Sequence, residues 1–216
     1  MSSIILKAES LKKQFDRKIV FHDLGFVVHA KEGLGVTGRN GSGKSTLVKI
    51  VSSILSPTAG EVRLEHDGTS VQKEKLYRHV GFVAPYLQLY DEFTAWENLH
   101  FVRRVRGLNA VDSILEHLLE KVNLIDRKDS YLRTYSSGMK QRLRYAFALL
   151  HEPEILILDE PTSNLDVEGI DLVHEIMQEQ VGHGILVVAT NEERDLLHCS
   201  TIIDMNAFVE EKSTHE

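Results

Sequence analysis

The chain has 216 residues, of which 42% are hydrophobic and 26% charged, an ordinary globular mixture that excludes disordered and fibrous proteins. Its 25 basic and 32 acidic side chains give a net charge of −7, which argues against nucleic-acid binding through bulk charge. One cysteine excludes a disulfide framework, and no apolar run approaches the roughly 18 residues of a membrane-spanning helix. We therefore expect a soluble globular protein of a reducing compartment.

The first part of the chain is expected to form strands and one helix. Residues 4–9 and 18–29 are predicted as strands, the second interrupted near residues 22–25, and residues 33–37 as a further strand. A glycine-rich turn and an amphipathic helix follow, because apolar residues recur there on one helical face. The residues of that face are Leu47, Ile50, Val51, Ile54 and Leu55.

The middle of the chain is predicted to be helical. Thr94 and Glu97 form a Thr-x-x-Glu capping box ahead of one helix, and another helix begins near Ser137. Between them, the spacing of apolar residues predicts an additional helix. The three apolar stripes are Leu99, Val102 and Val105; Val111, Ile114, Leu115, Leu118, Leu119 and Val122; and Met139, Leu143, Ala146, Phe147 and Leu150.

Strand character returns near the end of the chain. Residues 155–158 and 185–188 are apolar without alternation, which is typical of parallel strands buried on both faces, and residues 171–180 are predicted as the helix between them. The sequence thus predicts one α/β domain over residues 1–216. It has a mostly parallel sheet, an antiparallel β part at the N-terminus and a helical subdomain inserted at about residues 86–150.

A phosphate-binding loop is predicted between the strand at 33–37 and the helix after it, as in a P-loop NTPase core. The segment fits the pattern G-x-x-x-x-G-K-[ST], whose glycines let backbone N–H groups point at phosphate oxygens. Lys44 would reach the β- and γ-phosphates, and the Ser45 hydroxyl would ligate Mg²⁺. The loop consists of Gly38, Arg39, Asn40, Gly41, Ser42, Gly43, Lys44, Ser45 and Thr46.

Two adjacent carboxylates end the apolar strand at 155–158. Consecutive strand residues point to different sides, so Asp159 and Glu160 can have different roles. We expect Asp159 to hold Mg²⁺ through water, and Glu160 to face the γ-phosphate and polarise the attacking water.

With these motifs in this order, the chain resembles the nucleotide-binding subunit of an ABC transporter over about residues 4–205. Residues 135–142 resemble that family's LSGGQ signature: Ser136 and Gly138 match, whereas Tyr135, Ser137 and Met139 depart from it. Residues 163–166 resemble the family's D-loop and end at Asp166. Phe15 stands where the family has an aromatic residue that stacks on adenine.

The resemblance implies a chain that works in pairs. Ser136, Ser137, Gly138 and the free N–H groups of the following helix would bind the ATP held by a second protomer. Two copies would then close head to tail around two ATP molecules with Mg²⁺. The resemblance also implies a multi-spanning permease on a separate chain, a location on the cytoplasmic face of the membrane, and no nucleic-acid partner.

Two positions depart from the family in ways that affect catalysis. The Q-loop glutamine falls on Pro85, which has no amide, and Gln88 lies about 10 Å of extended chain further on. The switch histidine falls on Asn191, which can donate a hydrogen bond but cannot relay a proton. With Glu160, Lys44 and Asn191 as the catalytic set, we expect ATP hydrolysis at a reduced rate.

Other functions remain open at this point. The two departures would also suit a nucleotide-gated regulatory module of a membrane complex, and a soluble ABC-type ATPase or a small-molecule kinase shares the phosphate-binding loop. Arg103, Arg104 and Arg106 form a basic cluster that is either a solvated helix face or a contact with a membrane partner. Cys199 is expected to be an inert thiol.

Overall fold

The computed structural model describes residues 3–109 and 111–208, which fold around two sheets. The first sheet is antiparallel, with the strand order β2-β1-β4-β5. Its strands are β1 (Ile4–Phe15), β2 (Lys18–His29), β4 (Ala59–His66) and β5 (Thr69–Ser70). This sheet is the antiparallel part expected from the sequence.

The second sheet is parallel throughout, with the order β6-β7-β8-β3-β9. Its strands are β3 (Gly33–Thr37), β6 (Val80–Val83), β7 (Ile155–Asp159), β8 (Ile185–Ala189) and β9 (Thr201–Asp204). Because all strands run in one direction, the residues that follow β3, β7 and β8 emerge at the same edge. The predicted phosphate-binding loop, Glu160 and Asn191 follow these three strands.

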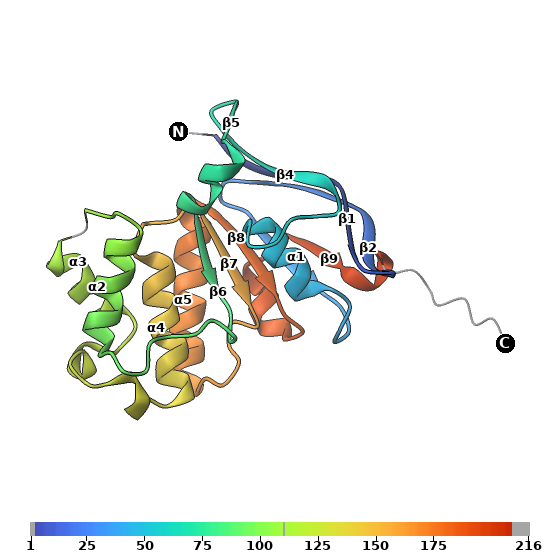
Figure 1. Ribbon diagram of the computed structural model, residues 1–216. Helices are drawn as coiled ribbons and strands as arrows, with labels where there is room; N and C mark the ends of the chain where they lie inside the picture. The colour runs from blue at the N-terminus through green and yellow to red at the C-terminus, as the bar shows by residue number, and fades with distance from the viewer. Residues whose placement is uncertain (1–2, 110, 209–216) are drawn as a thin grey trace.

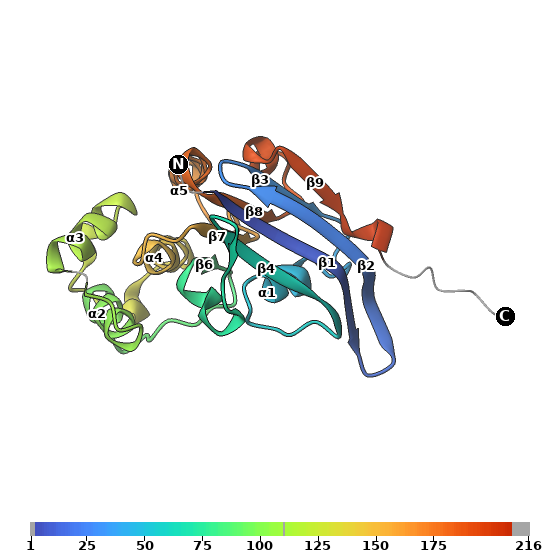
Figure 2. The ribbon, with the colours of Figure 1, turned by 90° about the horizontal axis from the view of Figure 1, so that it is seen from above.

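The helices divide between the two sides of the parallel sheet (Figure 1). Helix α1 lies under the antiparallel sheet, whereas α2, α3 and α4 gather on the opposite side, as the view from above also shows (Figure 2). The helices are α1 (Lys44–Val51), α2 (Ala95–Val105), α3 (Asp112–Lys121), α4 (Ser137–Leu149) and α5 (Val167–His183). Short 3-10 turns cover Lys73–Arg78, Ile125–Arg127, Leu132–Thr134, Glu193–His198 and Met205–Phe208. Within the described ranges, no helix is long and apolar enough to cross a bilayer.

The strands β7 and β8 separate two apolar cores. Ile155 and Ile157 pack on the side of α1 and the antiparallel sheet, while Leu156 and Leu158 pack on the side of α4 and α5. Both sets are completely buried, which explains why this segment is apolar at every position. Burying one such side chain stabilises the fold by about 1.5–3 kcal/mol, so the strand that ends at Asp159 is firmly held.

The predicted capping box is confirmed at the start of α2. The Thr94 hydroxyl accepts a hydrogen bond from the Glu97 N–H at 3.1 Å, and the Glu97 carboxylate accepts one from the Thr94 N–H at 2.8 Å. Two further helices begin on side-chain caps: Ser136 accepts from the Met139 N–H, and Asp166 accepts from the Gly169 N–H. These helix starts are therefore determined locally by the sequence.

Several predicted boundaries were wrong. Strand β2 is continuous, because shifts in its register with β1 absorb the irregularity expected near residues 22–25, and β1 extends to Phe15. Helix α1 ends at Val51, since Ser53 has a positive φ of 61°, and Ile54 is exposed. Val105 and Val111 are exposed at helix ends, where the apolar stripe has left the core.

Four strands were missed by the sequence analysis. The strand β4 is largely polar because one face of the antiparallel sheet is exposed, so its pattern is weak. The others, β5, β6 and β9, contain only two to four residues each. Such short segments carry too few positions to show a period.

Candidate functional site

The loop between β3 and α1 has a backbone that requires glycine. Gly38, Gly41 and Gly43 have φ values of 136°, 83° and 104°. A Cβ on Gly38 would lie 2.7 Å from the Ser42 hydroxyl, and one on Gly43 would lie 2.7 Å from the side chain of Val20. The loop curls in this way so that its N–H groups and the start of α1 can face an anion.

A cavity of about 430 Å³ opens beside this loop and joins three parts of the chain. The hairpin of β1 and β2 contributes Phe15, the loop contributes Lys44 and its neighbours, and the end of β7 contributes Glu160. The complete lining is Phe15, Lys18, Ile19, Val20, Asn40, Gly41, Gly43, Lys44, Ser45, Thr46 and Glu160. Phe15 is half-exposed at its rim, where a flat ring can stack on a base.

A larger groove, of about 600 Å³, lies between α3, α4 and α5. Its walls are helix side chains such as Leu118 and Ile176, and it has no glycine loop that could present N–H groups to phosphate. Of the two, the smaller cavity has the lining that suits the phosphates of a nucleotide. The Ser42 hydroxyl supports this assignment, since it is buried in the loop without a hydrogen-bond partner within the described part of the chain.

Lys44 and Asn191 meet at the loop. The Lys44 ammonium donates to the Gly38 carbonyl at 2.7 Å, and the Asn191 amide donates to the Asn40 side-chain oxygen at 3.3 Å. With its amide turned over, Asn191 donates to the Gly38 carbonyl at 2.7 Å and accepts from Lys44 at 3.1 Å. In both orientations, Asn191, two residues after β8, reaches the phosphate-binding loop from the same edge of the sheet.

Ser45 and Asp159 form an oxygen-rich pair at the end of β7. The Ser45 hydroxyl donates to Asp159 Oδ1 at 3.1 Å, and the Asp159 side chain is only 1% exposed. The Tyr86 hydroxyl donates to the other oxygen, Oδ2, also at 3.1 Å. Hydroxyl and carboxylate oxygens are hard donors of the kind that Mg²⁺ prefers, so the two residues fit this ion.

Glu160 occupies a strained position at the rim of the cavity. Its φ is +49°, and its N–H donates to the Ala189 carbonyl at 2.8 Å, which fixes the turn after β7. Burial raises the pKa of its carboxyl group, and the nearby Lys44 charge partly opposes this rise. A carboxylate with a raised pKa is a better proton acceptor than an ordinary one.

The signature residues lie outside this cavity. Ser136, Ser137 and Gly138 are at the start of α4, and none of the described residues lining the cavity belongs to this segment. Gly138 approaches the Asn164 carbonyl closely, since a Cβ there would lie 3.2 Å from it. Asp166, two residues further on, caps α5 and is exposed. The signature and D-loop segments thus contact each other, outside the chain's own nucleotide cavity.

Two polar residues near the site were missed by the sequence analysis. Tyr86 follows the proline at the Q-loop position, and only the adjacent departure from the family pattern could have drawn attention to it. Asp195 is buried and accepts from the hydroxyls of Thr162 at 3.1 Å and Thr190 at 2.9 Å. It joins the segments after β7 and β8, which carry Glu160 and Asn191.

The basic cluster of α2 is engaged within the chain. Arg103 pairs with Asp112 at 3.0 Å, and the Arg106 guanidinium lies 2.8 Å from His151. Arg103 and Arg106 therefore have partners within the chain, whereas Arg104 is exposed. Burial raises the pKa of the Cys199 thiol to about 12, which keeps it protonated as expected of an inert thiol.

Comparisons with known proteins identify the family. The family model described as "ABC transporter" matches residues 21–163. The bacitracin transport ATP-binding protein BcrA of Enterococcus faecalis is 36% identical over 173 residues, which are 80% of this chain and 56% of BcrA. The cytochrome c biogenesis ATP-binding export protein CcmA of Mannheimia succiniciproducens is 29% identical over 94% of both chains. The chain spans about half the length of BcrA and of the Bacillus subtilis ATP-binding protein YdbJ, of which it covers 55%.

Solved structures agree with this family and with the fold. An ATP-binding subunit of an ABC transporter has a TM-score of 0.79 at 28% identity, over 93% of this chain and 85% of that one. A dimeric ATP-binding cassette bound to ADP and Pi in a post-hydrolysis state has a TM-score of 0.83 over 95% and 97% of the two chains. Its identity of 21% supports the fold alone. On this evidence the chain belongs to the ABC transporter family.

Proposed function

We propose that this chain binds ATP with Mg²⁺ and hydrolyses it. The observation that carries the proposal is the convergence of Lys44, Ser45 and Glu160 on one cavity, with the buried Asp159 bonded to Ser45 behind it. Phe15 would stack on the adenine, and the loop N–H groups with Lys44 would hold the phosphates. Ser45 and Asp159 would hold the metal ion, which supplies charge stabilisation for phosphoryl transfer when bound.

Glu160 would orient the attacking water and accept its proton. Glu160 lines the same cavity as the phosphate-binding loop, and its raised pKa makes it a better proton acceptor than an ordinary glutamate. Asn191 would donate a hydrogen bond to the γ-phosphate from the position beside Lys44. Since an amide carries no positive charge, we expect this contact to stabilise the developing charge less than an imidazolium would.

We further propose that two copies close head to tail around two ATP molecules. The loop covers one side of the nucleotide, while Ser136 and the first N–H groups of α4 form an anion site that does not line the same cavity. An ATP molecule that contacts both copies only in the closed pair would shift the equilibrium toward closure. This closure would provide the mechanical step.

We propose that closure drives a membrane-spanning permease on a separate chain, on the cytoplasmic face. The relatives named above are transport and export proteins. The surface near α2 also carries a trio of exposed rings, with Tyr90 4.9 Å from Phe101 and 5.5 Å from Phe93 between centroids. Exposed aromatic clusters of this kind are typical of sites that bind another protein.

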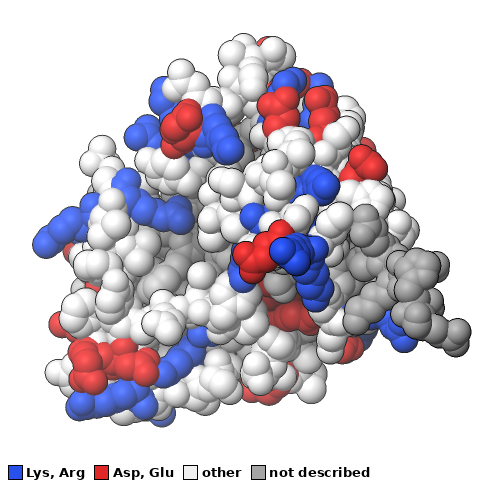
Figure 3. Space-filling view, turned by 45° about the vertical axis from the view of Figure 1, so that its right-hand side comes forward, with Lys and Arg blue, Asp and Glu red and all other residues white. Residues whose placement is uncertain are grey.

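A second candidate is a regulatory module that hydrolyses ATP only slowly. The observation in its favour is Asn191 beside Lys44, since the amide of this residue cannot relay a proton. Nucleic-acid binding is a weaker candidate, because acidic and basic side chains are interspersed over the face drawn in Figure 3.

The test is ATP hydrolysis by the purified chain, followed by affinity capture from solubilised membranes. We expect phosphate release without any acceptor substrate, which separates a hydrolase from a kinase, and a stoichiometric multi-spanning partner. Phe101→Glu should lose that partner, whereas Val27→Glu, at an exposed apolar position on β2, should retain it. Closed dimers that persist for many minutes with Mg·ATP would favour the regulatory module instead.

A further inference from the structure

The segment after β6 carries an unassigned contact to the proposed metal site. The resemblance to the ABC transporter family places Pro85 at the Q-loop position. A proline offers neither a side-chain donor nor an N–H. Gln88, the nearest amide, is exposed on the wall of a different pocket, with Leu87 and Arg144. The residue that reaches Asp159 is Tyr86, whose hydroxyl donates to Oδ2 at 3.1 Å.

The Tyr86 ring is held in place from two sides. The Lys49 ammonium of α1 lies 4.1 Å from the centre of the ring, and the Phe82 ring of β6 lies 6.4 Å away. A cation over an aromatic face and a neighbouring ring both restrict the ring's orientation. The hydroxyl is therefore aimed at Asp159 by contacts that do not depend on the hydrogen bond itself.

The two oxygens of Asp159 are held by hydroxyls from different loops. Ser45 donates to Oδ1 from the phosphate-binding loop, and Tyr86 donates to Oδ2 from the segment after β6. The carboxylate is buried, so it depends on these donors for its orientation.

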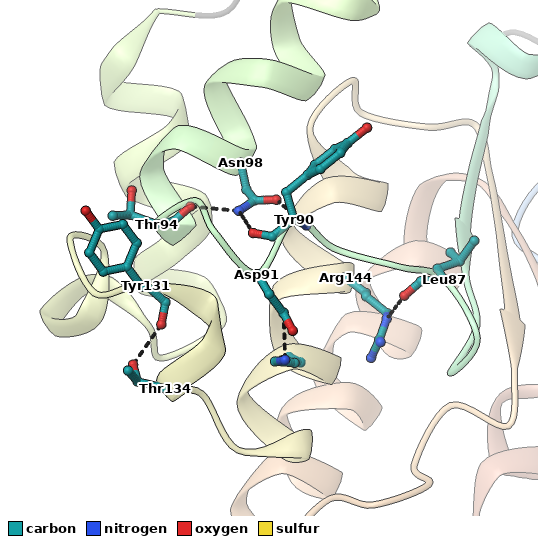
Figure 4. Close-up of polar contacts among 9 residues, drawn as sticks. Leu87, Tyr90, Asp91, Thr94, Asn98, Tyr131, Thr134 and Arg144 are labelled. Carbon is teal, nitrogen blue, oxygen red and sulfur yellow. Dashed lines mark hydrogen bonds and ion pairs between the residues drawn. The ribbon is translucent and has the colours of Figure 1, made fainter.

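The same segment continues as a strap to the helices. The Leu87 carbonyl accepts from Arg144 at 2.7 Å, and Asp91 pairs with Lys140 at 2.7 Å, both on α4 (Figure 4). Asn98 of α2 holds the strap between them, through bonds to the backbone of Tyr90 at 3.0 and 3.1 Å. The strap therefore connects the Asp159 contact to α4, the helix that begins with Ser136.

We propose that Tyr86 is a positioning residue of the metal site, and that its hydroxyl holds Asp159 in the orientation in which this carboxylate serves Mg²⁺. The inference rests on the proposed function of Ser45 and Asp159. Outer contacts of this kind typically change metal affinity by about 10- to 100-fold when they are removed. Tyr86→Phe removes the hydroxyl alone and keeps the ring over Lys49.

The test measures how much Mg²⁺ strengthens nucleotide binding. The Kd of a fluorescent ATP analogue is determined with saturating Mg²⁺ and with EDTA. The Kd in EDTA divided by the Kd in Mg²⁺ is the ratio compared between variants. We expect Tyr86→Phe to lower this ratio by about 10-fold while leaving the Kd in EDTA unchanged. Ser45→Ala should lower it too, and Tyr90→Phe, which removes a hydroxyl from a half-exposed ring on the same strap, should not.

Two other outcomes would count against the proposal, and they can be told apart. A ratio for Tyr86→Phe within about twofold of the wild type, with Ser45→Ala strongly reduced, would overturn the role of Tyr86 alone. A wild-type ratio of one would show that Mg²⁺ does not strengthen nucleotide binding. It would overturn the metal site proposed at Ser45 and Asp159 and, with it, this inference. Circular dichroism verifies that each variant is folded.

Discussion

The phosphate-binding side of this molecule and its signature side are built differently. Asp159 and Glu160 end a strand whose apolar residues are completely buried on both faces, so the core fixes their position. The signature at Ser136 begins a helix and is held by its own cap and by surface pairs such as Lys140 with Asp91. The first side assembles a cavity within one chain, whereas in the proposed dimer the second side is a half-site that another chain completes.

Replacing the catalytic carboxylate should have the largest effect on the phosphate-binding side. Glu160→Gln keeps the shape of the side chain but cannot accept a proton, so kcat should fall by about 10²- to 10⁴-fold. The Kd for ATP should change little, because the loop and Lys44 still hold the phosphates. Phosphate-release kinetics and equilibrium binding measure the two quantities; retained hydrolysis would remove Glu160 from its assigned role.

On the signature side, a substitution should weaken the ATP-dependent dimer as well as catalysis. Ser136→Ala removes one donor to a charged group, which should lower kcat by roughly 10- to 100-fold and weaken ATP-dependent dimers. Nucleotide binding to the single chain should be unaffected, since Ser136 is not part of the cavity lining.

Thr94→Ala is the matched control for this variant, because it removes the cap of another helix. Both variants should lose about 1 kcal/mol of stability, but only Ser136→Ala should lose dimerisation, measured by light scattering with Mg·ATP. Equal loss of dimerisation in both variants would show that Ser136 acts only as a helix cap.

A smaller change is expected at Asn191, which lies beside Lys44. Asn191→His introduces a side chain that can carry charge and relay a proton, so kcat should rise by about threefold or more. Steady-state kinetics of the wild type and of Asn191→His measure this change in kcat. No gain from the histidine would argue against this position as the switch residue.

The pH dependence of hydrolysis should reflect the environment of Glu160. Burial raises the pKa of this carboxyl group above its ordinary value of 4.5, and the proposed mechanism needs the ionised form. Activity should therefore be full at neutral pH and should fall, as the pH is lowered, at a higher pH than for an ordinary glutamate. A kcat profile that stays flat to below pH 4.5 would contradict this assignment.

The same contrast explains how much could be predicted from the sequence. Strands buried on both faces are apolar at every position, and the phosphate-binding loop combines glycines with one lysine, so local patterns identified both. Asn191 was expected at the switch position, and the structure brings it to Lys44 because β8 pairs in parallel with β3, the strand that leads into the phosphate-binding loop. Helix α2 was recognisable from its capping box.

The contacts made by loops could not be predicted in this way. Tyr86 reaches Asp159 across 73 positions of sequence, and Asp195 joins Thr162 to Thr190 from a short 3-10 turn. No period or spacing encodes such pairs, because they depend on how the sheet places three separate loops at one edge. The short strand β6 was missed for a related reason, since its four residues are too few to show a pattern.

In the proposed dimer, each active site combines the loop of one copy with the signature of another. Lys44→Ala disables the loop, and Gly138→Asp puts a negative charge into the anion site, so neither variant alone should hydrolyse ATP. When the two are mixed in equal amounts, half of the randomly formed dimers contain both variants, and each of these has one intact site out of two. We expect the mixture to recover about a quarter of the wild-type rate; no recovery above the separate variants would contradict the shared active site.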